Sequence, residues 1–109
     1  MEHFILDANG NPEPCHDLAQ WGLWMNDFER RRVALYECDG VKVSTVFLGL
    51  DHQFGNGEPL LFETMVFGGP LDGEQDRYST REAALAGHES TVLRVQSAAS
   101  SGGSGCATA

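Results

Sequence analysis

The sequence predicts an α+β fold: an antiparallel sheet of three to four strands with two helices, in the order β-α-β-β-β-α. Two observations carry this prediction. Two runs rich in β-branched and aromatic residues flank Asp39-Gly40, a dipeptide that is typical of a tight hairpin. Two other segments repeat apolar residues at spacings of three and four, which is the period of a helix. Because no internal repeat relates these segments, we expect one sheet with helices packed on it.

The first part of the chain is expected to contain a short strand and one helix. Phe4-Ile5-Leu6 is an apolar run that stops at the turn-forming residues Asn9-Gly10-Asn11-Pro12. Asp17 can then cap a helix that ends among Arg30-Arg31-Arg32. The apolar positions of this helix are Leu18, Trp21, Trp24, Met25 and Phe28. The three arginines suit the negative end of the helix dipole, and the alternative interpretation is a phosphate site.

The middle of the chain is expected to form the centre of the sheet. Residues 33–38 and 41–50 are predicted strands, and the turn between them pairs Glu37 with Lys42, whose opposite charges agree with this register. Apolar side chains point to both faces of the second of these strands, so it should be a central one. Residues 60–67 are the next predicted strand, which ends at Gly68-Gly69-Pro70.

A last helix and a tail complete the predicted organisation. Residues 71–78 are expected to be a polar loop, and Ser79 and Glu82 have the spacing of a capping box that opens a helix. The predicted core stripe of this helix consists of Leu85, His88, Val92 and Val95. We expect residues 1–96 to form a single globular domain and residues 97–109, which are rich in glycine, serine and alanine, to form a flexible tail.

Composition and charge exclude several classes of function. The 109 residues carry 16 acidic and 7 basic side chains, a net charge of −9, which repels phosphate backbones and argues against direct nucleic-acid binding. No apolar run approaches the length of a membrane span, and the first residues lack the basic start of a signal peptide, so a cytoplasmic location without membrane association is expected. No close pair of metal-ligand residues is present, so we expect neither a metal nor a cofactor.

The candidate site consists of polar residues set into or beside apolar elements. As catalytic candidates we take Asp51, His52, Glu63 and His88, and as binding candidates Ser44, Thr45, Asp72 and Tyr78. Each catalytic candidate also has a structural interpretation. His88 can be a core histidine that bonds Glu63 or Tyr78, Asp51 and His52 can cap a loop, and Glu63 can face solvent.

Three stretches of the sequence together resemble a family of small proteins of phages, prophages and bacteria. They are Val43 to His52, Leu60 to Gly69, and Arg77-Tyr78-Ser79-Thr80 followed by Glu82-Ala83 and Gly87-His88. The resemblance covers residues 3–96, with a departure at Arg81, where the family pattern leads us to expect tryptophan. It implies a phage-type accessory protein and transfers no catalytic residue.

Two hypotheses of function follow. The first is a small acidic, non-catalytic binding or inhibitor module. It binds either a basic surface of a host protein or a small signalling ligand, for example to counter a host defence. The alternative is a small hydrolase or lyase that uses His52 or His88 with Asp51 and Glu63, with a divalent metal as one option. Because the sheet has two apolar faces and only two predicted helices, we also expect a homo-oligomer.

Overall fold

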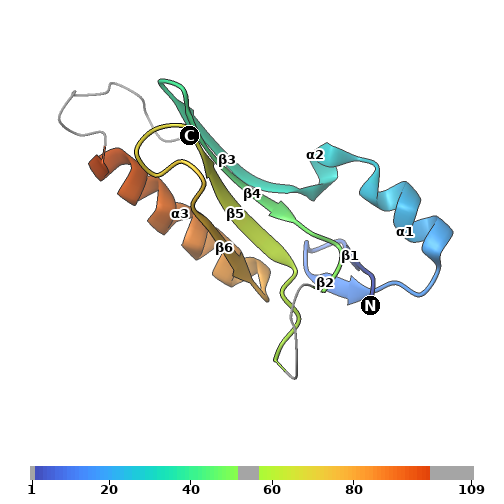
Figure 1. Cartoon of the computed structure of the whole chain (residues 1–109). Helices are drawn as coiled ribbons and strands as arrows, with labels where there is room; N and C mark the ends of the chain where they lie inside the picture. Colours follow the sequence, from blue (N-terminus) through green and yellow to red (C-terminus); the bar gives the residue numbers. More distant parts are fainter. Residues whose placement is uncertain (1, 52–56, 99–109) are drawn as a thin grey trace.

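The α+β class is confirmed by a computed structural model, which describes residues 2–51 and 57–98. Its main sheet is antiparallel, with the strand order β3-β4-β5-β6. These strands are β3 (Arg32–Cys38), β4 (Val41–Phe47), β5 (Phe62–Phe67) and β6 (Gln75–Tyr78). The long helix α3 (Arg81–Ala98) lies along one face of this sheet (Figure 1). Helix α3 includes Ser97 and Ala98, which were expected in the tail, whereas residues 99–109 lie outside the described part of the chain.

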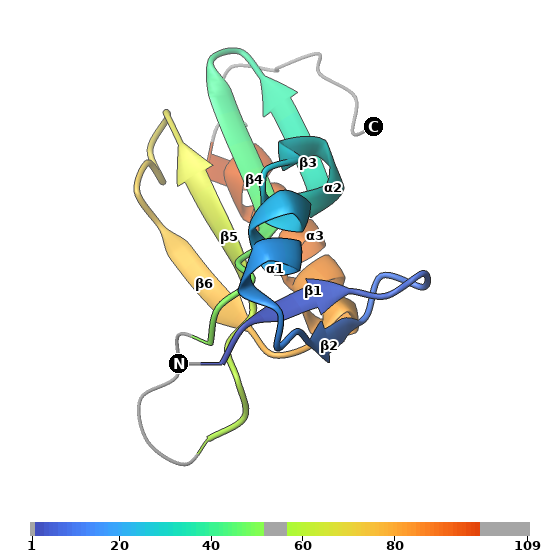
Figure 2. The same ribbon diagram turned by 90° about the vertical axis from the view of Figure 1, so that its right-hand side faces the viewer.

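The N-terminal part adds elements that were not predicted. A small sheet pairs β1 (Phe4–Leu6) with β2 (Pro12–Pro14), and α1 (Leu18–Met25) is followed by the short helix α2 (Phe28–Arg31). The single helix expected up to the arginines is therefore two helices. The break arises because the Asp27 side chain accepts a hydrogen bond from the Arg30 amide and so begins a second helix. Figure 2 shows α1 and α2 on the opposite side of the main sheet from α3.

The order β-α-β-β-β-α is thus extended to β-β-α-α-β-β-β-β-α. The extra strand β2 begins at Pro12, the last residue of the predicted turn. It pairs with β1 as an edge strand, a place that tolerates its two prolines. The extra strand β6 lies in the predicted polar loop. Strands β2 and β6 were not predicted, because short polar strands show no alternation of apolar residues. They form because a neighbouring strand is available for them to pair with.

The central hairpin has the predicted register. Asp39 and Gly40 have φ values of 50° and 81°, as a two-residue turn with two left-handed positions requires. Glu37 pairs with Lys42, and Tyr36 pairs with Val43. Side chains therefore reach the face predicted for them, because a slip by one residue would have exchanged the two faces of the strand.

Helix α3 begins and packs differently from the prediction. The Thr80 hydroxyl, and not Ser79, accepts a hydrogen bond from the Ala83 amide at 3.1 Å. The buried residues of the helix are Ala84, Thr91, Val92 and Val95. Leu85, predicted in the core, is 41% exposed, and His88 is half-buried. The buried face of α3 is therefore rotated about the helix axis relative to the predicted one, so that Leu85 lies at the edge of the contact with the sheet.

Two apolar clusters form the core of the sheet and helix. One gathers Phe4, Phe47, Leu61, Phe62 and Ala84, and the other gathers Tyr36, Val43, Val66, Val92 and Val95. Trp24 of α1 packs on the first cluster, with its ring edge-on to Phe47 at 5.5 Å between centroids. On β4, Thr45 lies between Val43 and Phe47, so a polar side chain separates the two clusters.

Candidate functional site

A buried chain of hydrogen bonds links the sheet to α3. Thr45 of β4 is directly opposite Thr64 of β5, and both side chains are fully buried. Their hydroxyl oxygens are 2.6 Å apart, and the Thr45 hydroxyl is also 2.7 Å from Nδ1 of His88 on α3. Antiparallel pairing places the two hydroxyls on the same face, and α3 supplies the imidazole from above them. The structure thus brings together two predicted residues, Thr45 and His88.

The imidazole of His88 is held neutral at the end of this chain. Burial lowers the pKa of His88 below its ordinary value, because desolvation disfavours the charged ring. Its Nδ1 bonds Thr45, whereas Nε2 has no hydrogen bond to any described residue. In a neutral imidazole, one ring nitrogen can bond a hydroxyl while the other ring nitrogen forms a hydrogen bond with a further partner. The groove beside α3 is where such a partner can reach it.

A groove of about 430 Å³ runs between α3 and β3, and His88 lines it. Its apolar walls are Tyr36 from β3 and Leu85, Val92 and Leu93 from α3. Leu35 of β3 also borders the groove, although its side chain points to the opposite face of the sheet together with that of its partner Ser44. Leu85 and Leu93 are 41% and 58% exposed. Strand β3 is at one end of the four-stranded order, so one of its long sides is unpaired within the sheet. The groove therefore combines an open strand edge, exposed leucines and one polar ring.

Two predicted site residues lie on the other face of the sheet. Glu63 precedes Thr64 on β5, and side chains of a strand alternate between faces, so Glu63 points away from His88. Its carboxylate accepts a hydrogen bond from Nε of Arg77 at 3.0 Å. Ser44 alternates with Thr45 in the same way and pairs with Met65. The structure therefore does not bring Glu63 or Ser44 to the imidazole of His88.

The remaining predicted residues serve loops and packing. Asp51 accepts a hydrogen bond from the Leu60 amide at 3.1 Å, and Asp72 accepts one from the Gly68 amide at 2.6 Å. Tyr78 packs on the first core cluster, next to Gly87 of α3, where an added Cβ would lie 2.2 Å from the phenolic oxygen. His52 lies outside the described residues.

Neither a metal centre nor a membrane span is found in the described part of the chain. Residues 2–51 and 57–98 contain no group of three histidine, cysteine or acidic side chains placed to hold an ion. Within the same ranges, no helix combines the length and the apolar character that crossing a membrane requires.

Leu35 and Leu93, which border the groove, were not predicted as site residues. A signal for Leu93 existed, because Leu85, Glu89 and Leu93 recur every four residues along one side of α3. That spacing describes a continuous stripe, but only the packing of Ala84 and Val92 on the sheet shows that the stripe is exposed.

Comparison of the chain with models of protein families, with curated proteins and with solved structures finds no significant match in any of the three. The resemblance to small phage and bacterial proteins therefore stays a prediction.

Proposed function

We propose that the protein is a non-catalytic binding module that takes an extended segment of a partner protein as an added strand along β3. The observation that carries this proposal is the groove in which the open edge of β3 runs beside the exposed leucines of α3. Peptides commonly bind in this way, with main-chain hydrogen bonds for affinity and side-chain pockets for specificity. Together with the resemblance to phage-type proteins, such a module fits inhibition of a host protein.

The open edge offers backbone groups in a defined pattern. In the β3–β4 ladder, alternate residues of β3 direct their N–H and C=O groups toward β4. The two-residue turn makes Tyr36 one of these, so Leu35 and Glu37 direct theirs toward the open edge. An added strand can pair with these groups, and its side chains then alternate between the groove and the opposite face of the sheet.

Charge and apolar contacts define the chemistry of the partner segment. Leu85 and Leu93 require apolar side chains on the groove side of the added strand. Glu37 on the open edge and Glu89 in the groove are both exposed, and the chain has a net charge of −9. We therefore infer a segment in which apolar and basic residues alternate, because acidic rims favour basic partners.

Leu93→Asp is expected to weaken binding of a synthetic peptide of alternating lysine and valine by about tenfold or more, because it places a charge in the apolar wall. Fluorescence anisotropy of the labelled peptide measures this. Leu23→Asp is the matched control, because Leu23 is an exposed leucine of α1 outside the groove. Binding should also slow hydrogen exchange at the Leu35 and Glu37 amides.

Two results would contradict this proposal. One is equal weakening by Leu93→Asp and Leu23→Asp, and the other is binding of a glutamate-valine peptide as tight as that of the lysine-valine peptide. Cleavage of the bound peptide that is lost in His88→Ala would support the alternative of a hydrolase.

We also propose that a second copy of the chain contacts the sheet face opposite α3. Met65 is half-buried there, and Phe67 is 43% exposed under the Lys42 ammonium. Helices α1 and α2 also lie on the side of the sheet opposite α3 (Figure 2). Glu37 and Lys42 still carry opposite charges beside Phe67, so two copies related by a two-fold axis can pair each with the other.

Met65→Lys is expected to convert a dimer into a monomer, because it places a charge at the centre of the proposed contact. Light scattering at micromolar concentration measures the mass. Leu18→Lys, at an exposed leucine of α1, should leave the dimer intact. A monomer mass for the unchanged protein would refute the contact between copies without affecting the groove.

A further inference from the structure

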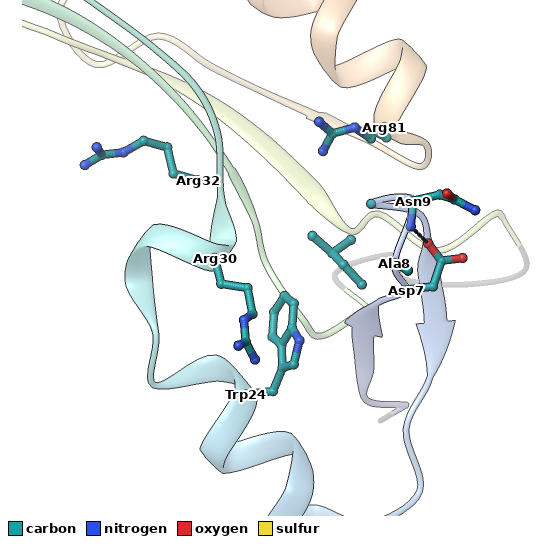
Figure 3. Close-up of a pocket in the computed structure, with 9 residues that line it drawn as sticks. Asp7, Ala8, Asn9, Trp24, Arg30, Arg32 and Arg81 are labelled. Atoms are coloured by element: carbon teal, nitrogen blue, oxygen red, sulfur yellow. Dashed lines mark hydrogen bonds between the residues drawn. The ribbon is translucent and has the colours of Figure 1, made fainter.

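A second cavity, of about 490 Å³, lies where the turn between β1 and β2 meets the helices α1, α2 and α3 (Figure 3). The turn between β1 and β2, residues 7–10, forms one wall, and Trp24 at the end of α1 forms another. Arg30 of α2 and Arg81 at the start of α3 line the same space. This volume is typical of pockets that hold a small organic molecule.

Two arginines line different walls of the cavity, and Figure 3 shows the guanidinium of Arg30 running along the Trp24 ring and turned away from Arg81. The guanidinium of Arg30 lies over the Trp24 ring, with its central carbon 5.7 Å from the ring centroid. Arg81 approaches from the other side in Figure 3, and its guanidinium lies against the backbone of Gly10. A Cβ built on Gly10 would be 3.0 Å from Nη1 of Arg81, so this close approach depends on the glycine.

These two cations are weakly neutralised by the protein itself. Arg81 forms no ion pair with any residue that the structure describes, and the carboxylate nearest to Arg30 is that of Asp27, at 3.9 Å. Asp7 is the acidic residue of the cavity wall, and its Oδ1 accepts hydrogen bonds from the Asn9 and Asn11 amides at 2.8 and 2.9 Å. Oδ1 of Asp7 thus holds the turn, and within the described residues Asp7 forms no ion pair with either arginine, so both guanidinium groups are available to a ligand.

Arg32 contributes less to this pair of cations. It lines the cavity, but Figure 3 shows its side chain extending away from Trp24. Its guanidinium lies over the Phe28 ring, 5.2 Å from the centroid, and 3.6 Å from the carboxylate of Glu29. Arg30 and Arg32 therefore differ in position: Arg30 lines the cavity beside Trp24, whereas Arg32 lies over Phe28 on the surface of α2.

We propose that this cavity binds a small phosphorylated molecule, with the phosphate on Arg81, the organic part against Trp24, and Arg30 adding a second positive charge to the cavity. A guanidinium binds phosphate oxygens through two parallel hydrogen bonds, and a phosphomonoester carries nearly two negative charges at neutral pH. Its charge can therefore balance both cations of the cavity, whereas a carboxylate offers one charge. In a chain with a net charge of −9, such a local pair of cations selects an anion at this place.

Calorimetric titration of the full chain with AMP tests the proposal, with adenosine and acetate as comparison ligands. AMP is expected to bind more tightly than either, and raised salt should weaken its binding. Arg81→Gln should reduce AMP affinity by about tenfold or more, because it removes a charged donor to the phosphate. Arg77→Gln is the matched control, because Arg77 pairs with Glu63 on the main sheet and lies outside the cavity.

A second variant tests the proposal independently of any effect that Arg81→Gln has on folding. Gly10→Ala keeps both arginines in the chain, but its Cβ would lie 3.0 Å from Nη1 of Arg81 and its φ of 81° strains the turn, so the Arg81 guanidinium must move. AMP affinity should then fall while the Arg30 contact to Trp24 remains. Circular dichroism confirms that each variant is folded. Adenosine binding as tight as AMP, or unchanged AMP affinity in folded Arg81→Gln, would overturn the proposal. Neither change touches the β3 groove, so failure here is separate from failure of peptide binding.

Discussion

Phe47→Ala is expected to lower the free energy of unfolding by about 3–5 kcal/mol, the largest effect we predict for any single change. Phe47 is fully buried, and its ring contacts Phe62 at 5.4 Å and Trp24 at 5.5 Å between centroids. Through Trp24 it holds α1 on the end of the sheet. Truncation removes the ring from all of these partners and leaves a cavity that the fixed strands β4 and β5 cannot close.

Urea denaturation followed by circular dichroism measures this loss. Phe28→Ala is the matched control, because it makes the same chemical change at a residue of α2 that is 50% exposed. Phe28 lies under Arg31 and Arg32, and such exposed contacts contribute about 1 kcal/mol or less each. Similar losses for the two variants would mean that α1 is not anchored through Phe47.

Thr45→Val is expected to lower the free energy of unfolding by about 1–3 kcal/mol, although valine has nearly the same shape as threonine. The Thr45 hydroxyl bonds both Thr64 and Nδ1 of His88, so its removal leaves two buried polar groups without their partner. The apolar replacement cannot compensate, because valine offers neither a donor nor an acceptor to the fully buried Thr64 hydroxyl or to Nδ1 of His88.

Thr91→Val provides the comparison for this second change. Thr91 is also buried, but its hydroxyl donates to the Gly87 carbonyl within α3, and that carbonyl keeps its helical partner. Loss of the Thr91 hydroxyl should therefore lower the free energy of unfolding by less than loss of the Thr45 hydroxyl. The same urea titration measures both variants. A cost for Thr45→Val no greater than that for Thr91→Val would show that the chain from Thr64 to His88 does not stabilise the fold. In that case, His88 would be available for ligand binding alone.

The hairpin was predictable because its causes are local. Asp39 and Gly40 accept positive φ, and the two-residue turn that they form decides which residues of the two strands pair. The pairing of Glu37 with Lys42 follows from the turn alone. Such features depend on residues within a few positions of one another, so the sequence is sufficient to predict them.

The core face of α3 was not predictable in the same way. Leu85 satisfies the helical period as well as Ala84 does, and it is the larger apolar residue. In the structure, Ala84 is fully buried against Phe47 and Phe62, and Leu85 is exposed. A small side chain is needed where the helix crosses two phenylalanine rings, and the position of that crossing is a property of the packed sheet and not of the helix sequence.

The candidate site shows the same division. Thr45 and His88 could be identified from the sequence as polar residues in apolar elements, but they are 43 positions apart, and no local rule brings them within 2.7 Å. Glu63 was expected near them, and alternation along β5 carries it to the opposite face.

By itself, then, the sequence determined the class of fold, the hairpin with its register, and the excess of negative charge. Only the tertiary structure decided that α3 leaves Leu93 exposed beside the open edge of β3, and that Arg81 meets Trp24 across a cavity. The physical reason is one of range. Turn geometry and side-chain alternation act between neighbours, whereas grooves and cavities are formed by elements that pack together from distant parts of the chain.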